Sequence, residues 1–254
     1  MKKKGGIATS TKKTFYYFMI RHILVSTGII IDTVILGIIY LVLSPVDFKG
    51  KISDFLSRLW SVVLLFISGV RTKIIGLENI DRNHSYIIVS NHQSYFDIPV
   101  IIGYFPLSVR MLAKKELFRI PIFGWAIYIA GHISLDRGKG KKAIISLKKA
   151  SERIRKKKFS LVVYPEGTRS PNGEVKRFKK GAFRLAMESK LPILPVSIIG
   201  SRKVMPKHSL RINKGEIKII IGKPIITTDI KKDELIGLRD MARNEIIKNI
   251  GIQY

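Results

Sequence analysis

The chain has 254 residues, enough for one large α/β domain with an appendage, and it lacks cysteine, which excludes disulfides, zinc–thiolate sites and thiol nucleophiles. Its formal net charge of +28 favours anionic partners, but 46% hydrophobic residues and a mean hydropathy of +0.15 make it too apolar for a typical nucleic-acid-binding protein. The basic and apolar character together indicate a membrane surface.

Two apolar segments follow a basic N-terminal tail. The first covers residues 15–43, and its part from 23 to 43 is long enough to cross a bilayer. Asp32 lies in the middle of this part, where an ionised carboxylate costs roughly 2.5–3.5 kcal/mol. The second covers residues 55–70, is interrupted by Arg58 and is short for a crossing.

The charge distribution predicts how these segments meet the membrane. Because the basic tail and the basic remainder of the chain should both stay cytoplasmic, the chain should cross the membrane twice or not at all. We therefore expect residues 1–70 to form a basic tail and two helices lying in one leaflet, on the cytoplasmic face of the membrane. Residues 71–254 would form a catalytic domain. A single-span anchor is the competing interpretation.

From residue 72 onward, short apolar strands alternate with helical patterns, which is typical of an α/β fold with a mostly parallel sheet flanked by helices. Helices are predicted over residues 141–157 and 233–250, the second with Leu235, Leu238, Met241 and Ile246 on its apolar face. The predicted strands are Tyr86–Ser90, Arg110–Ala113, Ile133–Asp136, Leu161–Tyr164, Ile193–Ile199 and Ile217–Ile221.

The turn after the first of these strands carries the strongest chemical signal. His92 follows the strand, and Pro99 favours the first turn of a helix with Asp97 as its cap. If His92 lies in the turn, the chain can fold the Asp97 carboxylate back onto the imidazole, fixing its tautomer and stabilising its cation. A structural histidine beside an ordinary helix cap is the alternative interpretation of these residues taken alone.

A second polar cluster follows the strand that ends at Tyr164. Its residues are Pro165-Glu166-Gly167-Thr168-Arg169-Ser170, which combine a carboxylate, a guanidinium group and a glycine that lets the backbone approach a ligand. In open α/β sheets ligands collect outside the carboxyl ends of strands, so the two clusters can share one crevice. Arg137, which ends a third strand, is another candidate.

In this order and spacing four motifs resemble those of the lysophosphatidic acid acyltransferases (1-acyl-sn-glycerol-3-phosphate acyltransferases), over roughly residues 70–225. The four motifs are His92 and Asp97 separated by four residues, Gly131 to Arg137, Pro165 to Ser170, and the apolar run Leu191 to Val196. The segment from Lys115 to Gly124 also resembles the family.

The resemblance implies transfer of a fatty acyl group from acyl-carrier protein or acyl-CoA to the sn-2 hydroxyl of lysophosphatidic acid. His92 would be the general base and Asp97 would orient it. Arg137 and Arg169 would bind the acceptor phosphate, Lys115 would add a point charge, and Glu166, Gly167 and Thr168 would shape the acceptor pocket. No cofactor is implied, and one histidine with scattered carboxylates is not a metal-ligand set.

Two other interpretations remain open. In the first, the chain is an acyltransferase of the same fold that acts on glycerol 3-phosphate or on another lysolipid. In the second, the chain is a non-catalytic basic protein that binds anionic lipid. Nucleic acid is not expected as a partner, because the aromatic residues cluster in the N-terminal segments and in residues 118–125 rather than among exposed lysines and arginines. The charge predicts attraction to anionic membrane lipid under all of these interpretations.

Overall fold

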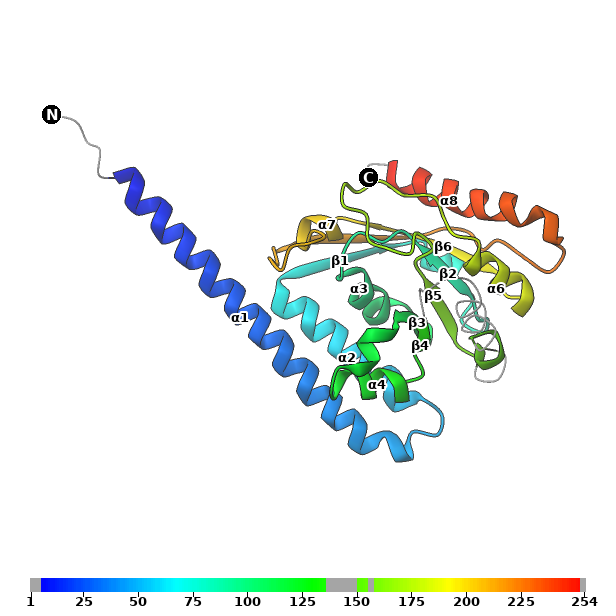
Figure 1. Cartoon of the computed structure of the whole chain (residues 1–254), viewed down its shortest axis with the longest axis horizontal. Coiled ribbons are helices and arrows are strands. Elements are labelled where there is room, and N and C mark those ends of the chain that lie inside the picture. The colour runs from blue at the N-terminus through cyan, green and yellow to red at the C-terminus, as the bar shows by residue number, and fades with distance from the viewer. Residues whose placement is uncertain (1–5, 136–149, 155–157, 252–254) are drawn as a thin grey trace.

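The structure is a computed structural model that describes residues 6–135, 150–154 and 158–251. The described residues form a seven-stranded sheet with helices on both faces, preceded by a long helix that projects from the body of the molecule (Figure 1). The strand order is β1-β7-β6-β2-β5-β3-β4. The sheet is mostly parallel, because β6–β7 is the only antiparallel pair among the described strands. The predicted fold class is therefore confirmed. The strands are β1 Val70–Ile75, β2 Ile87–Ser90, β3 Val109–Lys114, β4 Ile133–Leu135, β5 Ser160–Val163, β6 Ile193–Ile199 and β7 Gly215–Ile221.

The helices are α1 Gly6–Leu43, α2 Lys51–Ser68, α3 Asp97–Tyr104, α4 Phe123–Ile129, α6 Gly181–Ser189, α7 Ser201–Val204 and α8 Leu235–Gly251. Short 3₁₀ turns are η1 Ser44–Val46, η2 Leu77–Asn79, η3 Lys115–Arg119 and η4 Lys232–Glu234. In Figure 1, α1, α2 and α4 lie together on one side of the molecule and α8 lies on the opposite side.

The central strands are buried on both faces, which explains why they read as unbroken apolar runs. In β2, Ile88 packs into a core shared with α2 and α3, whereas its neighbours Ile87 and Val89 pack into a second core shared with α6 and α8. In β5, Val162 and Leu161 divide between the two cores in the same way. Helices on both faces leave the carboxyl edge of the sheet as the place where polar loops gather.

The sequence did not predict β1. Its apolar residues alternate with Arg71 and Lys73, both exposed, because β1 is an edge strand and its charged side chains face solvent. Helix α2 also runs almost directly into β1, separated from it by Gly69 alone, and the apolar segment over residues 55–70 covers the junction. A continuous apolar pattern therefore concealed the change from helix to strand.

Two helix predictions also need comment. The C-terminal helix is present as α8, but Met241 is 58% exposed and the buried position beside it is Ala242, so the predicted apolar face was wrong at that residue. The helix predicted over residues 141–157 lies partly outside the described residues. Residues 150–154 are helical, with Ala150 and Ile154 buried.

The two N-terminal helices pack against each other and against the domain. The Trp60 indole donates to Thr33 Oγ1 at 3.0 Å, which joins α2 to α1. Arg58 donates to the Phe105 carbonyl at 2.7 Å, and Asp54 forms a 2.6 Å ion pair with Arg110 on β3. One helical segment, Met19–Val46, is long and apolar enough to cross a membrane. Asp32 is buried in this structure.

Candidate active site

The turn after β2 brings a histidine and a carboxylate into direct contact. His92 Nδ1 lies 2.7 Å from Asp97 Oδ2, and Asp97 is fully buried while His92 is 8% exposed. Because a carboxylate oxygen accepts, Nδ1 carries the hydrogen and Nε2 keeps its lone pair. The imidazole is therefore held in the tautomer that a general base requires.

Asp97 does not cap α3 as the sequence predicted. It is the first residue of the helix, and its Oδ2 accepts from the backbone N–H groups of Gln93 (2.7 Å) and Ser94 (2.9 Å), which precede it. The carboxylate folds the turn back on itself and holds His92 there. Pro99 does lie in the first helical turn, as expected.

The loop after β5 meets this turn, because β2 and β5 are neighbouring parallel strands whose carboxyl ends share one edge. Glu166 Oε1 accepts from the His92 N–H at 2.8 Å, and the Ser170 N–H donates to the His92 carbonyl at 2.7 Å. The other Glu166 oxygen accepts from the Lys176 N–H at 3.2 Å. Burial raises the pKa of Glu166, although these two N–H groups act in the opposite direction.

Tyr164 forms one wall of the site. Its ring stacks on the His92 imidazole, with the centroids 4.1 Å apart and the planes inclined by 15°. Burial, with a smaller contribution from the Asp97 charge, raises the pKa of Tyr164 well above its ordinary value, so the phenol stays neutral and protonated. The stack restricts imidazole rotation and keeps Nε2 in a fixed direction.

Arg169 lies on the neighbouring surface. Its guanidinium carbon is 3.7 Å from the centroid of the Tyr95 ring, and its Nη1 is buried without a hydrogen-bond partner. Gly167 has φ +77°, a left-handed conformation that favours glycine, and a Cβ there would also displace the end of the Lys179 side chain. Thr168 is exposed and accepts a hydrogen bond from Lys207.

The remaining predicted site residues are placed less completely. Lys115 begins η3, directly after β3, and is exposed at the surface. Arg137 lies outside the described residues, so its place in the site stays a prediction.

Sequence comparison identifies the family to which this arrangement belongs. The acyltransferase family profile matches residues 61–199, which include the turn after β2 and the loop after β5. The chain belongs to the acyltransferase family. The resemblance of its four motifs is thereby confirmed, and the chain is an acyltransferase.

Individual relatives of the acyltransferase agree with this assignment. A 1-acyl-sn-glycerol-3-phosphate acyltransferase from Saccharomyces cerevisiae is 35% identical over 218 residues, covering 84% of this chain and 71% of the yeast protein. A chloroplastic 1-acyl-sn-glycerol-3-phosphate acyltransferase from Brassica napus is 35% identical over 207 residues, covering 81% of this chain and 58% of the plant protein. The crystal structure of the 1-acyl-sn-glycerophosphate (LPA) acyltransferase PlsC from Thermotoga maritima matches with a TM-score of 0.81 at 26% identity, covering 92% of this chain and 95% of that one.

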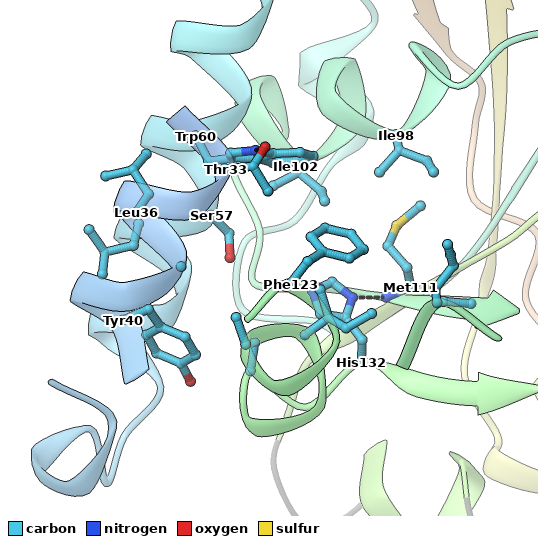
Figure 2. Close-up of a pocket in the computed structure, with 17 residues that line it drawn as sticks. Thr33, Leu36, Tyr40, Ser57, Trp60, Ile98, Ile102, Met111, Phe123 and His132 are labelled. Carbon is cyan, nitrogen blue, oxygen red and sulfur yellow. Dashed lines mark hydrogen bonds between the residues drawn. The ribbon is translucent and has the colours of Figure 1, made fainter. Parts of the chain in front are cut away.

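An apolar cavity of about 110 Å³ lies between the N-terminal helices and the sheet of this acyltransferase (Figure 2). Ile98, next to Asp97 in the sequence, forms part of its wall, together with residues of α1, α2, β3 and α4. Gly37 of α1 lines the cavity, and a Cβ there would lie 2.8 Å from Ile122.

His132, which the sequence did not single out, also lines the cavity. It is 7% exposed, and its Nδ1 accepts from the Met111 N–H at 3.0 Å (Figure 2). Burial, and then the nearby Arg110 and Arg153 charges, lower the pKa of His132 from 6.5 to about 3. The imidazole is therefore neutral at physiological pH.

Sequence reasoning missed several residues that build the acyltransferase site. Asn91 is fully buried, and its side-chain amide pairs with both the N–H and the carbonyl of Ile198, at 2.8 and 2.9 Å. This pairing fixes the chain direction just before His92. The available signal was two adjacent polar residues at the end of a buried strand, Ser90 in its last position and Asn91 directly after it. The tyrosine stack on His92 left no trace in the sequence.

Proposed function

We propose that this acyltransferase moves a fatty acyl group from acyl-CoA or acyl-carrier protein to the sn-2 hydroxyl of lysophosphatidic acid, with His92 as general base. The 2.7 Å contact between His92 Nδ1 and Asp97 Oδ2 carries the proposal, because it leaves Nε2 as a free base at the crevice edge. The names of the yeast, plant and Thermotoga relatives support the acceptor.

The reaction needs one proton to move from the acceptor hydroxyl to His92 and then from His92 to the leaving thiolate. His92 Nε2 takes the proton of the sn-2 hydroxyl as that oxygen attacks the thioester carbonyl, and Asp97 stabilises the imidazolium that forms. The tetrahedral intermediate then collapses, the carbon–sulfur bond breaks, and His92 returns its proton to the departing thiolate. A base positioned in this way is typically worth about 10²–10⁴-fold in rate.

The acceptor phosphate would lie against Arg169. Its guanidinium group is held flat by Tyr95 and keeps one buried nitrogen without a partner, which is the state expected of a fork that awaits an anion. Arg137, which lies outside the described residues, would add a second guanidinium group for the phosphate, as the resemblance to the family implies. Glu166 positions the His92 backbone and so contributes by orientation.

The part of the donor's acyl chain next to the thioester would occupy the apolar cavity beside Ile98. Its wall is made mainly of aliphatic and aromatic side chains, and it begins one residue from Asp97. Inserting the chain there would leave the thioester close to His92.

Membrane association would bring the crevice to the lipid acceptor. Apolar side chains are exposed on three neighbouring elements, including Phe66 of α2 (82%), Phe48 of the α1–α2 turn (89%), and Trp125 and Tyr128 of α4 (55% and 68%). Exposed apolar surface of this extent marks an interaction site. We propose that it enters the cytoplasmic leaflet and that the basic surface adds attraction to anionic lipid.

The test is thiol release from acyl-CoA by the purified protein in detergent, with lysophosphatidic acid as acceptor. The chain has no cysteine, so a thiol reagent reads only released CoA. We expect acceptor-dependent release, its loss in His92→Ala, and a loss of at least about 10²-fold in Asp97→Asn. Near-normal turnover in His92→Ala would refute the mechanism. No release with lysophosphatidic acid but release with glycerol 3-phosphate would move the proposal to that acceptor.

A further inference from the structure

Lys207 is a cation at the crevice edge that none of the four motifs includes. It lies in the segment between α7 and β7, and its Nζ donates to Thr168 Oγ1 at 3.3 Å. Thr168 precedes Arg169 directly, so this hydrogen bond brings a lysine from a distant part of the chain to the proposed phosphate site.

Hydrogen bonds hold the backbone around Lys207 in a defined conformation. Pro206 to Ser209 form a turn closed by the Ser209 N–H on the Pro206 carbonyl at 3.1 Å, with His208 at φ +66°. Ser94 Oγ, in the catalytic turn, donates to the Met205 carbonyl at 2.9 Å, and Met205 is buried. Lys207 is therefore tied to both catalytic loops, to the first through Met205 and to the second through Thr168.

The charges of Lys207 and Arg169 are not neutralised within the described part of the chain. No described aspartate or glutamate lies within ion-pair distance of either residue. Two uncompensated cations beside one loop form a field that favours an anion with more than one negative charge.

We propose that Lys207 is a specificity-determining residue that, with Arg169, selects a phosphomonoester headgroup over a phosphodiester. A phosphomonoester carries about −1.5 to −2 charges at pH 7, whereas a diester carries one. The Arg169 fork satisfies one charge through two parallel hydrogen bonds, and the lysine supplies a point charge for the second. The proposal rests on the proposed function, because it assigns a role at the acceptor site of that reaction.

The test compares Lys207→Met with wild type on two acceptors that share one acyl chain, lysophosphatidic acid and lysophosphatidylglycerol, in detergent micelles. Methionine keeps the aliphatic stem and removes the charge. We expect the KM for lysophosphatidic acid to rise about tenfold, the loss of one charge-assisted hydrogen bond, with kcat and the KM for acyl-CoA unchanged. The kcat/KM for lysophosphatidylglycerol should stay within about twofold, so that selectivity for the monoester falls.

Two further variants make the result specific. Lys203→Met removes the same charge from an exposed position on α7, four residues earlier in the chain, and should leave selectivity unchanged. Lys207→Arg should restore most of the wild-type KM, because it restores the charge.

Several outcomes overturn the proposal. Equal losses on both acceptors, an equal effect of Lys203→Met, or a rise in the acyl-CoA KM instead of the acceptor KM would each refute the assigned role. The last of these would place Lys207 at the phosphates of the donor. If wild type fails to acylate lysophosphatidic acid at all, the proposed function falls with this inference. If wild type is active and Lys207→Met is unaltered, only this inference falls.

Discussion

At the scale of single residues, the site depends on hydrogen bonds to the backbone of His92 as much as on those to its ring. The imidazole is fixed by Asp97 and by stacking on Tyr164, and the main chain on either side is fixed by Glu166 and by the Ser170 N–H. If His92 is the general base, as proposed, it is positioned before substrate arrives, which is how an enzyme avoids reorganisation during the reaction.

Glu166→Gln should reduce both stability and turnover. The amide oxygen can replace the carboxylate oxygen that accepts from the His92 N–H at 2.8 Å, but the NH₂ group would then face the Lys176 N–H, a second donor. A buried donor without an acceptor costs about 1–3 kcal/mol. Thermal unfolding and initial rates measure the two effects, and kcat should fall by roughly tenfold or more as His92 shifts.

The control for this substitution is Glu174→Gln, an exposed residue in the same loop. It changes the net charge equally and should leave both measurements unchanged. Wild-type stability together with wild-type turnover in Glu166→Gln would contradict a positioning role for the carboxylate.

His132 should make the protein less stable in acid. Its pKa is about 3 in the fold and near 6.5 in the unfolded chain, so between these values the unfolded state binds more protons. The stabilisation is fully present above pH 6.5 and is lost progressively as the pH falls toward 3. His132→Asn keeps an acceptor for the Met111 N–H but does not titrate, so its unfolding midpoint should change less between pH 7.5 and pH 5 than that of wild type.

The comparison uses the difference between the two pH values, because asparagine is smaller and lowers stability at every pH. His208→Asn is the matched control, since His208 is exposed and its φ of +66° suits asparagine. Identical pH dependence in wild type and His132→Asn would show that the buried histidine does not contribute.

At the scale of elements, the cavity depends on helices that are far apart in the sequence. Its wall extends from Thr33 on α1 to His132 before β4, with α2, α3 and α4 between them. The Asp54–Arg110 ion pair and the Arg58 bond to the Phe105 carbonyl hold α2 in place, and α2 in turn holds α1. The N-terminal helices therefore shape the cavity in addition to any contact they make with lipid.

Ala126→Phe should alter which acyl chains the enzyme accepts. Ala126 lines the cavity from α4, and a phenyl ring there would occupy part of the space proposed for the chain. We expect the rate with a long-chain acyl-CoA to fall more than the rate with a short-chain one. Ile129→Phe adds the same ring at a position of α4 that is 46% exposed, and should leave the ratio unchanged. An equal fall in rate with both donors would show that the acyl chain does not occupy the cavity.

Sequence patterns predicted the strands that are buried on both faces, because such strands are apolar without interruption. They also predicted that the polar clusters containing His92 and Glu166 can share one crevice, since both clusters follow strands of a parallel sheet. Sequence patterns failed where contacts with distant parts of the chain decide whether a residue is buried or exposed. Arg71 and Lys73 concealed an edge strand, Met241 fits an apolar period yet lies on the surface, and Lys207 is brought to Thr168 only by the turn at His208.

At the scale of the whole molecule, the position of α2 restricts how the chain can sit in a membrane. One face of α2 packs on α3 so closely that a Cβ on Gly103 would lie 3.2 Å from Ser61, and Asp54 pairs with Arg110 of the sheet. If α2 crossed the bilayer, it would draw α3 and these charges into hydrocarbon, at a cost of several kcal/mol for each unpaired polar group. Partial immersion of the exposed faces of α1, α2 and α4 avoids this cost.

The last prediction distinguishes immersion from a crossing of the membrane by both α1 and α2. Lys49 lies in the turn between α1 and α2, Lys73 lies on β1 at the edge of the sheet, and both side chains are exposed. Because the chain has no cysteine, Lys49→Cys and Lys73→Cys each give a single site for a membrane-impermeant thiol reagent in sealed vesicles. If the helices lie in one leaflet, both sites should be labelled from the same side, which is also the side from which added acyl-CoA is consumed. Labelling of Lys49→Cys only from the opposite side would mean that α1 and α2 cross the membrane, and the packing of α2 on α3 would then have to break.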